Sequence, residues 1–196
     1  MSELAGAVDR EHGVLELHYS FDVPHGWEKL TELIIHIANR NRDNRKFGKL
    51  KLLKILFHAD FRAYNELGRP ITGIQYRRFP YGPVGTDALN AIEQDEHLAF
   101  KETYYPEFPH AQIRVLATRE ATRLTELLGA DELEIVEAEI RRMWDMSAEE
   151  VSSQSHGSAW GNVASFAPIP YESAFLAEPA EVGEADFAAI RDILPE

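Results

Sequence analysis

The sequence of 196 residues contains no cysteine. This absence excludes disulfide bonds, cysteine-rich zinc sites and a thiol nucleophile, and it is typical of proteins in a reducing compartment. Long apolar runs are also missing, because no apolar stretch approaches the roughly 20 residues that a membrane-spanning helix needs. The first residues carry neither the basic segment nor the apolar core of a secretion signal. We therefore expect a cytoplasmic protein without a membrane partner.

Basic residues are scarce in the C-terminal part of the chain. From residue 126 to the end there are sixteen Asp and Glu but only three Arg, a difference equal to the whole net charge of −13. Residues 40–54 show the opposite balance, with seven Arg and Lys and one acidic residue, Asp43. Such an asymmetry favours fast association with a charged partner but does not determine the fold.

The sequence also lacks the residue sets of common active sites. His58 and Asp60 are two residues apart, so a single helix would place them on different faces. His156 lies among serines, but there is no Gly-x-Ser-x-Gly motif, and the glycines occur singly rather than in a phosphate-binding loop. We therefore predict that the protein is not an enzyme, has no catalytic residues and needs neither a metal ion nor a cofactor. His156 is predicted to be a structural histidine with its hydrogen bonds satisfied, and His58 a structural helix histidine at the boundary of the core.

What is present indicates a folded domain, since 44% of the residues are hydrophobic and 10% are aromatic. Apolar residues recur at helical spacing after Pro24, which predicts a first helix that ends before the polar loop 39–44. A second helix is predicted from Phe47 to Leu67, because a glycine and a proline follow it closely.

The second helix carries a broad apolar band, so we expect it to be the central helix of the fold. Lys49, Lys51 and Lys54 are predicted to lie on the exposed edge of its N-terminal end. Lysines at this end oppose the helix dipole at a cost of a few tenths of a kcal/mol each. We interpret this cost as a sign that the lysines contact a partner.

The middle of the chain predicts short β elements. Residues 71–79 are rich in β-branched and aromatic residues, and the sequence FPYGPV at 79–84 predicts a rigid turn because two prolines fix φ on either side of Gly82. A third helix is predicted over 86–96. Two further strands, 98–105 and 111–116, are expected to form a hairpin.

The last third is predicted to be helical, with a short helix from Thr118 and two helix starts with capping-box spacing. The pairs with this spacing are Asp131 with Glu134 and Ser147 with Glu150. The expected fold class is therefore α+β and predominantly α-helical, with a compact helical core around the central amphipathic helix and a small antiparallel β element. The predicted divisions are an N-terminal extension, 1–24, in which residues 15–21 alternate as in a strand, one domain over 25–178, and a linker with a C-terminal helix over 179–196.

The Leu-rich second helix ends in an Ala-Asp-Phe step and precedes GRPITG and YGPV. In wording and order these motifs resemble the Panacea domain of SocA-like and phage-associated, GepA-like bacterial antitoxins. Later motifs complete the resemblance from about residue 49 to 176. They are Met146 to Glu150, Ser155-His156 with Trp160, and Ile169 to Glu172.

The resemblance implies an antitoxin that neutralises a cognate protein toxin encoded nearby. Toxins of the family are diverse, and in one branch the antitoxin delivers the toxin to an ATP-dependent protease. Tight binding depends on a few aromatic and arginine anchors, and rigidity lowers the entropy lost on binding. We therefore predict that Arg77, Arg78, Phe79 and Tyr81, on the two-proline turn, contact the partner together with the three lysines. The alternative for Phe79 and Tyr81 is that they pack into the core beneath the second helix.

The alternative function is a nucleic-acid-binding regulatory protein. The basic residues of 40–54 and 69–78 could form a positive stripe, with Tyr76, Phe79 and Tyr81 as aromatic residues within reach of bases. The strongly negative net charge and the absence of a helix-turn-helix pattern argue against nucleic acid as the main partner.

Overall fold

The computed structural model describes residues 16–176 of the chain. Leu15 and the predicted linker and C-terminal helix of 179–196 lie outside these residues. The elements are, in chain order, α1 (Gly26–Arg40), α2 (Lys49–Leu67), β1 (Tyr76–Phe79), β2 (Gly82–Gly85), α3 (Thr86–Gln94), β3 (Leu98–Thr103), β4 (Gln112–Ala117), α4 (Leu124–Leu127), α5 (Ala130–Met143), α6 (Ala148–Gln154), α7 (Ser158–Gly161) and the 3₁₀-helix η1 (Tyr171–Phe175).

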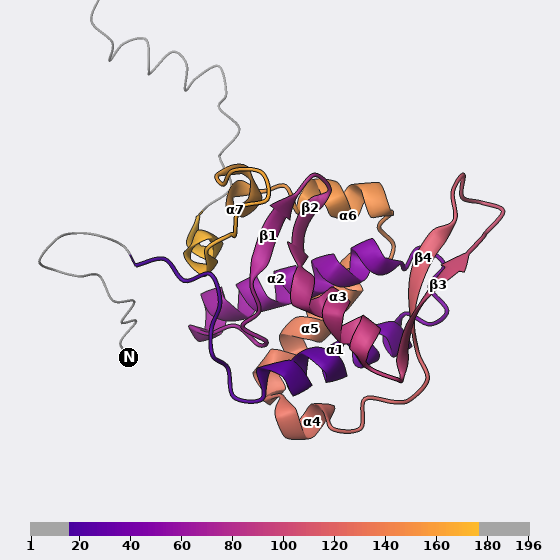
Figure 1. Cartoon of the computed structure of the whole chain (residues 1–196), viewed down its shortest axis with the longest axis horizontal. Helices are drawn as coiled ribbons and strands as arrows, with labels where there is room; N and C mark the ends of the chain where they lie inside the picture. The colour runs from indigo at the N-terminus through magenta and orange to yellow at the C-terminus, as the bar shows by residue number, and fades with distance from the viewer. Residues whose placement is uncertain (1–15, 177–196) are drawn as a thin grey trace, which may run out of the picture.

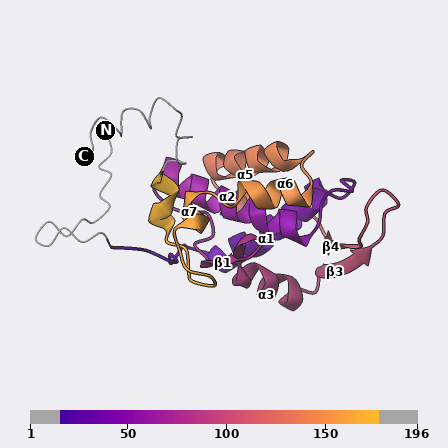
Figure 2. The ribbon, with the colours of Figure 1, turned by 90° about the horizontal axis from the view of Figure 1, so that it is seen from above.

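The predicted fold class is confirmed, because helices dominate and the strands form two small antiparallel sheets (Figure 1). Helix α2 lies in the centre, in contact with α1, α5, α6, η1, β2 and β4. Seen from above, α5 and α6 lie on one side of α2 and α3 lies on the other (Figure 2). The broad apolar band of α2 is explained by this position, since several elements cover it at once.

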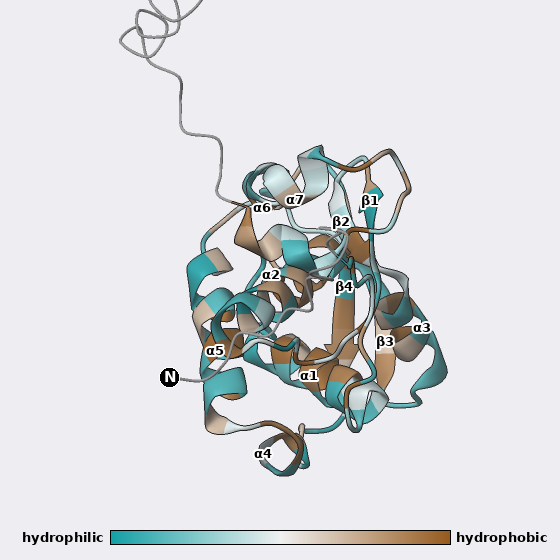
Figure 3. Cartoon of the chain, turned by 90° about the vertical axis from the view of Figure 1, so that its left-hand side faces the viewer, coloured by the Kyte–Doolittle hydropathy of each residue, from teal (hydrophilic) through white to brown (hydrophobic). Residues whose placement is uncertain are grey.

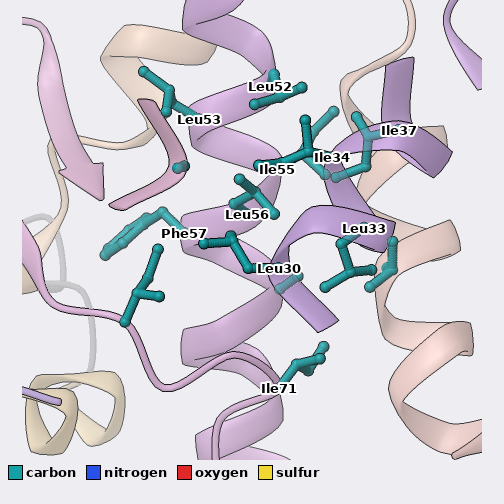
Figure 4. Close-up of a cluster of buried hydrophobic side chains, with 14 of the residues drawn as sticks. Leu30, Leu33, Ile34, Ile37, Leu52, Leu53, Ile55, Leu56, Phe57 and Ile71 are labelled. Carbon is teal, nitrogen blue, oxygen red and sulfur yellow. The ribbon is translucent and has the colours of Figure 1, made fainter. Parts of the chain in front are cut away.

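Apolar side chains of α1 pack against α2 to form the middle of the core (Figure 4). Hydrophobic residues gather in the interior while the outer faces of the helices are polar (Figure 3). The core residues drawn in the close-up are each at most 4% exposed: Leu30, Leu33, Ile34, Ile37, Leu52, Leu53, Ile55, Leu56, Phe57 and Ile71.

Residues 16–21 do not form the predicted strand. The backbone N–H of Phe21 donates to the carbonyl of Gly73 at 2.9 Å, and its ring packs edge-on against Tyr171. Of the alternating apolar residues, Phe21 therefore packs on the aromatic core, whereas Leu17 is 43% exposed. The segment stays irregular because Gly73 belongs to a loop, which provides no strand for it to pair with.

The turn at 79–84 is part of a hairpin that the sequence analysis did not predict. Strand β1 pairs with β2, and the register of Phe79 with Gly82 leaves Pro80 and Tyr81 as a two-residue turn. Gly82 has a φ of 96°, a conformation that suits glycine. The predicted hairpin of β3 and β4 is confirmed with pairing from Leu98–Ala117 to Thr103–Gln112.

Helix ends follow the predicted capping chemistry with one correction. The Ser147–Glu150 capping box is present at the start of α6, since each side chain accepts from the other residue's backbone N–H. At the start of α5, however, Glu132 accepts from the N–H of Gly129 at 2.9 Å. The predicted pair of Asp131 with Glu134 is therefore wrong by two residues, because α5 begins earlier than expected.

A buried carboxylate fixes the loop that follows α2. Asp60 is 1% exposed and accepts the backbone N–H groups of Ile71 at 2.9 Å and Thr72 at 2.8 Å. Its second oxygen accepts the hydroxyl of Thr72 and that of Tyr76, the latter at 2.8 Å. Burial raises the pKa of Asp60 above its usual value, while these four donors favour the ionised form. Asp60 thus joins α2 to the loop and to the first residue of β1.

We predict that Asp60→Asn lowers the free energy of unfolding by about 2 kcal/mol. The amide keeps one acceptor oxygen but cannot accept both hydroxyl hydrogen bonds, and buried donors without acceptors are costly. Chemical denaturation followed by circular dichroism measures the change. Asp43→Asn is the matched control, because Asp43 is exposed and its substitution should change stability by less than about 0.5 kcal/mol. Equal stability of the two variants would contradict the role given to Asp60.

Candidate functional site

The three lysines of α2 do not form the predicted exposed edge. Lys49 is partly exposed, with its ammonium 5.6 Å from the centre of the Phe100 ring, but Lys51 is 1% exposed and Lys54 is 0% exposed. The prediction of exposure is therefore wrong for Lys51 and Lys54. The reason is that α5, α6 and β2 cover this part of α2 and provide carbonyl groups for the two ammonium groups.

Lys51 caps the C-terminal end of α5. Its Nζ donates to the carbonyl of Met146 at 2.6 Å and to that of Trp144 at 3.2 Å. A cation at this end of a helix is favourable because it meets the negative end of the helix dipole. Burial lowers the pKa of Lys51 to about 8.

The buried side chain of Lys54 binds the β1–β2 hairpin to α2. Its Nζ donates to the carbonyl of Pro83 at 2.6 Å. A Cβ atom on Gly82 would lie 2.7 Å from this Nζ and 2.2 Å from the hydroxyl oxygen of Ser155, so only glycine fits between them. Burial lowers the pKa of Lys54 to about 7. Lys54 therefore holds the hairpin through a hydrogen bond, and its ammonium group is not at the surface.

We predict that Lys54 makes the stability of the protein depend on pH. Between pH 7 and 9 the unfolded chain keeps a proton on this lysine, whose unperturbed pKa is 10.5, while the folded protein releases it. The free energy of unfolding must therefore rise by about 2 kcal/mol between pH 7 and pH 9, since one proton is released on folding. This gain is lost as the pH falls back to 7. Denaturation curves at pH 7 and pH 9 should show a clearly larger gain in the wild type than in Lys54→Met, in which Lys51, with a pKa of about 8, still releases a proton in this interval.

The matched control for this experiment is Lys49→Met, in the same helix. Lys49 is partly exposed, so this variant should keep the pH dependence of the wild type. A Lys54→Met variant that gains as much stability between pH 7 and 9 as the wild type would show that another group titrates in this range.

Arg77 and Arg78 contact the segment that runs beside β1. The guanidinium of Arg77 donates to the carbonyl of Phe166 at 3.2 Å, and that of Arg78 donates to the carbonyl of Val163. The Arg78 guanidinium carbon also lies 4.0 Å from the centre of the Trp160 ring, which is a close cation–π contact. Both arginines are partly buried. Arg78 in particular holds the hairpin and the segment 160–166 together.

The alternative left open by the sequence is wrong for both rings, because neither Phe79 nor Tyr81 belongs to the hydrophobic core beneath α2. Phe79 is partly buried, with its ring 5.4 Å from that of Phe166 in a T-shaped contact. Tyr81 is 73% exposed at the tip of the hairpin and does not enter the core. The sequence analysis did not single out Phe166, which is 56% exposed beside Phe79.

Two hydrogen bonds hold the hairpin tip in place. The Trp160 indole N–H donates to the carbonyl of Phe79 at 2.9 Å, and the hydroxyl of Ser152 donates to the carbonyl of Tyr81 at 3.1 Å. Figure 1 shows the tip of the hairpin between α7 and α6, which supply these two donors. The exposed ring of Tyr81 is therefore presented on a backbone that is fixed from both sides.

The two histidines considered above are buried in different surroundings. His156 stacks on Trp160 with ring centres 4.1 Å apart, and burial lowers its pKa. Burial lowers the pKa of His58 to about 3, and His58 lines a cavity of about 270 Å³ with Arg62 and Arg142. The Nε2 atoms of both rings are buried and have no hydrogen-bond partner among residues 16–176. The expectation of satisfied hydrogen bonds is thus wrong for the Nε2 atom of His156.

The basic residues of the polar loop after α1 are paired with carboxylates. The pairs are Arg40 with Glu137 at 3.1 Å, Arg42 with Glu120 at 3.3 Å and Arg45 with Glu107 at 3.0 Å. Lys46 donates to the carbonyl of Asp145 at 2.6 Å. These pairs reduce the positive field of residues 40–54, and the burial of Lys51 and Lys54 removes two further cations from the surface.

Within residues 16–176, no helix combines the length and the apolar character needed to cross a membrane.

The arrangement described above is that of a rigid helical scaffold that presents a fixed hairpin. Comparison with known proteins adds the class: the family model described as antitoxin SocA-like, Panacea domain, matches residues 52–161. This range covers more than half of the chain, so the chain belongs to the SocA-like Panacea family of antitoxins, as the motifs predicted. No curated protein and no solved structure matches the chain.

Proposed function

We propose that this antitoxin-family protein neutralises a cognate protein toxin by binding it directly in the cytoplasm, without catalysing a reaction. The observation that supports this most directly is the position of Tyr81, which is 73% exposed on a hairpin whose tip carbonyls are held by Trp160 and Ser152. A large exposed aromatic ring on a fixed backbone has the properties of a binding hot spot.

The rigidity of the hairpin explains how such a surface could bind tightly. Pro80 fixes one turn residue, the Lys54 ammonium holds the carbonyl of Pro83, and Gly82 fits against Lys54 and Ser155 without room for a side chain. A surface that is already ordered loses less conformational entropy on binding, so more of the contact energy contributes to affinity. Steric inhibition needs only this property.

We predict that Tyr81→Ala abolishes neutralisation while the protein stays folded. Loss of a central aromatic anchor typically lowers affinity by more than about tenfold. The measurement is growth of cells that express the toxin encoded beside the antitoxin gene together with each variant. Circular dichroism of the purified variants checks the fold.

Tyr104→Ala is the matched control for this experiment. Tyr104 is 75% exposed, almost the same as Tyr81, but it lies at the end of β3 on the hairpin that projects from another part of the molecule (Figure 1). This variant should protect cells as well as the wild type does. If both variants protect equally, the β1–β2 hairpin is not the toxin-binding surface.

The amount of toxin in the protected cells distinguishes two routes. Steric inhibition leaves the toxin level unchanged, whereas delivery to an ATP-dependent protease lowers it. We propose steric inhibition, because the fixed hairpin provides a binding surface and requires no further partner.

The alternative is a nucleic-acid-binding regulatory protein. Ion pairs of Arg40, Arg42 and Arg45 with glutamates leave little free positive charge in the loop after α1. Since phosphate contacts supply most of the affinity for nucleic acid, we predict no mobility shift of DNA or RNA by the purified protein at physiological salt. A sequence-selective shift would favour the regulatory function.

A further inference from the structure

One feature of the surface at the hairpin tip is the absence of charge. Residues 151–171 form a run of 21 residues without Asp, Glu, Lys or Arg, in a chain of which 27% is charged. The next longest uncharged run in the sequence is the eight residues 79–86, which contain the hairpin turn. The two longest uncharged segments of the chain are therefore the α6–η1 segment and the hairpin.

The fold places these two segments against each other. Ser152 and Trp160 donate to the carbonyls of Tyr81 and Phe79, and the backbone N–H of Phe166 donates to the carbonyl of Arg78 at 2.7 Å. Much of the longer segment lies at the surface, with residues 161, 162 and 164–166 exposed. In a protein with a net charge of −13, hydrogen bonds thus join the two longest uncharged segments, with Arg77 and Arg78 beside them. Depletion of charge with enrichment of aromatic rings is characteristic of the centre of a protein interface.

Phe166 is held in an unfavourable conformation at this surface. Its φ is 64°, a region that bulky residues rarely adopt, and its ring is 56% exposed. The backbone hydrogen bond to Arg78 and the hydrogen bond from Arg77 to the Phe166 carbonyl both fix this conformation. A glycine here would relieve the strain, and the exposed ring contributes little to the core. Strain of this kind at an exposed residue points to a binding role.

The charges at the edge of the region indicate what it contacts. Arg77 and Arg78 border it, and neither has a carboxylate partner among residues 16–176, since their guanidinium groups donate to backbone carbonyls. A basic rim without carboxylates favours a partner that brings acidic side chains to it. At the centre, a charged group of the partner would lose its hydration without gaining an ion pair, so the partner must be uncharged there.

We infer that Phe166, Phe79 and Tyr81 form a single aromatic anchor at the centre of an uncharged docking surface, which takes a toxin surface with an apolar centre and acidic residues at its edge. This inference rests on the proposed function and extends it. Phe166 lies outside the residues matched by the family model, which end at 161. Because it also lies between the motifs Ser155 to Trp160 and Ile169 to Glu172, we assign it as a residue that sets the specificity of this chain.

Two variants at one position separate the ring from the backbone. Phe166→Ala removes the ring and keeps the strained conformation, whereas Phe166→Gly removes both. The melting temperature of Phe166→Gly should be equal to or above that of the wild type and a few degrees above that of Phe166→Ala. Both variants should bind the toxin at least about tenfold more weakly, measured by titration calorimetry with the purified toxin that the wild type neutralises. A role of Phe166 in stability alone would lower the melting temperature of both variants and leave affinity unchanged.

Phe175→Ala is the matched control, because Phe175 is 53% exposed and lies in η1, four residues beyond the uncharged segment. It should bind the toxin with wild-type affinity. The acidic edge of the toxin is tested with Arg77→Gln, which keeps a hydrogen-bond donor but removes the charge. Its association rate should fall, and the difference from the wild type should shrink at high salt. A faster association would show that the edge of the toxin surface is basic.

The outcomes separate this inference from the proposed function. If Tyr81→Ala loses neutralisation while both Phe166 variants bind like the wild type, the hairpin is the binding surface but the aromatic anchor does not include Phe166. If the wild-type protein neutralises none of the toxic proteins encoded beside its gene, the proposed function fails and this inference fails with it. Wild-type neutralisation with weakened binding by both Phe166 variants supports both.

Discussion

The carboxylate of Asp60 is the interaction on which the arrangement of the hairpin depends. It accepts four hydrogen bonds from three residues that lie 11 to 16 positions further along the chain. Because Asp60 is in the middle of the central helix and Tyr76 begins β1, this one group sets where the β1–β2 hairpin starts relative to α2. Lys54, less than two helical turns earlier, then fixes the far strand through the carbonyl of Pro83. Two buried polar groups on one helix thus determine the direction in which the hairpin tip points.

The motifs that carried the resemblance to the family have structural roles in this chain. The Ala-Asp-Phe step and the sequence GRPITG are the two sides of the Asp60 network, and Gly82 of YGPV is the position without room for a Cβ. Trp160 holds the hairpin tip, and Glu172 accepts from the hydroxyl of Tyr64 at 3.0 Å and from the backbone of His18 at 2.9 Å. A motif can therefore identify a family by the way its members build their scaffold, although Tyr81, a proposed contact with the partner, is itself the first residue of YGPV.

The sequence predicted the fold better than the site for a physical reason. Hydrophobic periodicity reports which face of a helix is buried, so the limits of α1 and α2 and the central position of α2 could be predicted. The same reasoning assigns every lysine to the surface, and it failed for Lys51 and Lys54 because their carbonyl acceptors come from residues 29 to 95 positions away. Strand β2 was missed because Gly-Pro-Val-Gly is typical of a turn, and only pairing with β1 makes it a strand. Phe166 has no local signal at all, since its exposure and its positive φ depend on contacts with β1.

The division between scaffold and anchor suggests how one domain could serve different partners. The residues that fix the hairpin, from Lys54 to Trp160, fall within the range matched by the family model, and changing them would disturb the fold. Tyr81 and Phe166, by contrast, are largely exposed, and their rings contribute little to the core, so substitution there changes the binding surface at little cost in stability. If members of the family neutralise different toxins, as the resemblance implies, they need this separation, because a new partner then requires new exposed side chains on an unchanged support. In this chain the two longest uncharged segments lie together on this support, and in our proposal the exposed rings are the centre of the binding surface and the two arginines are its edge.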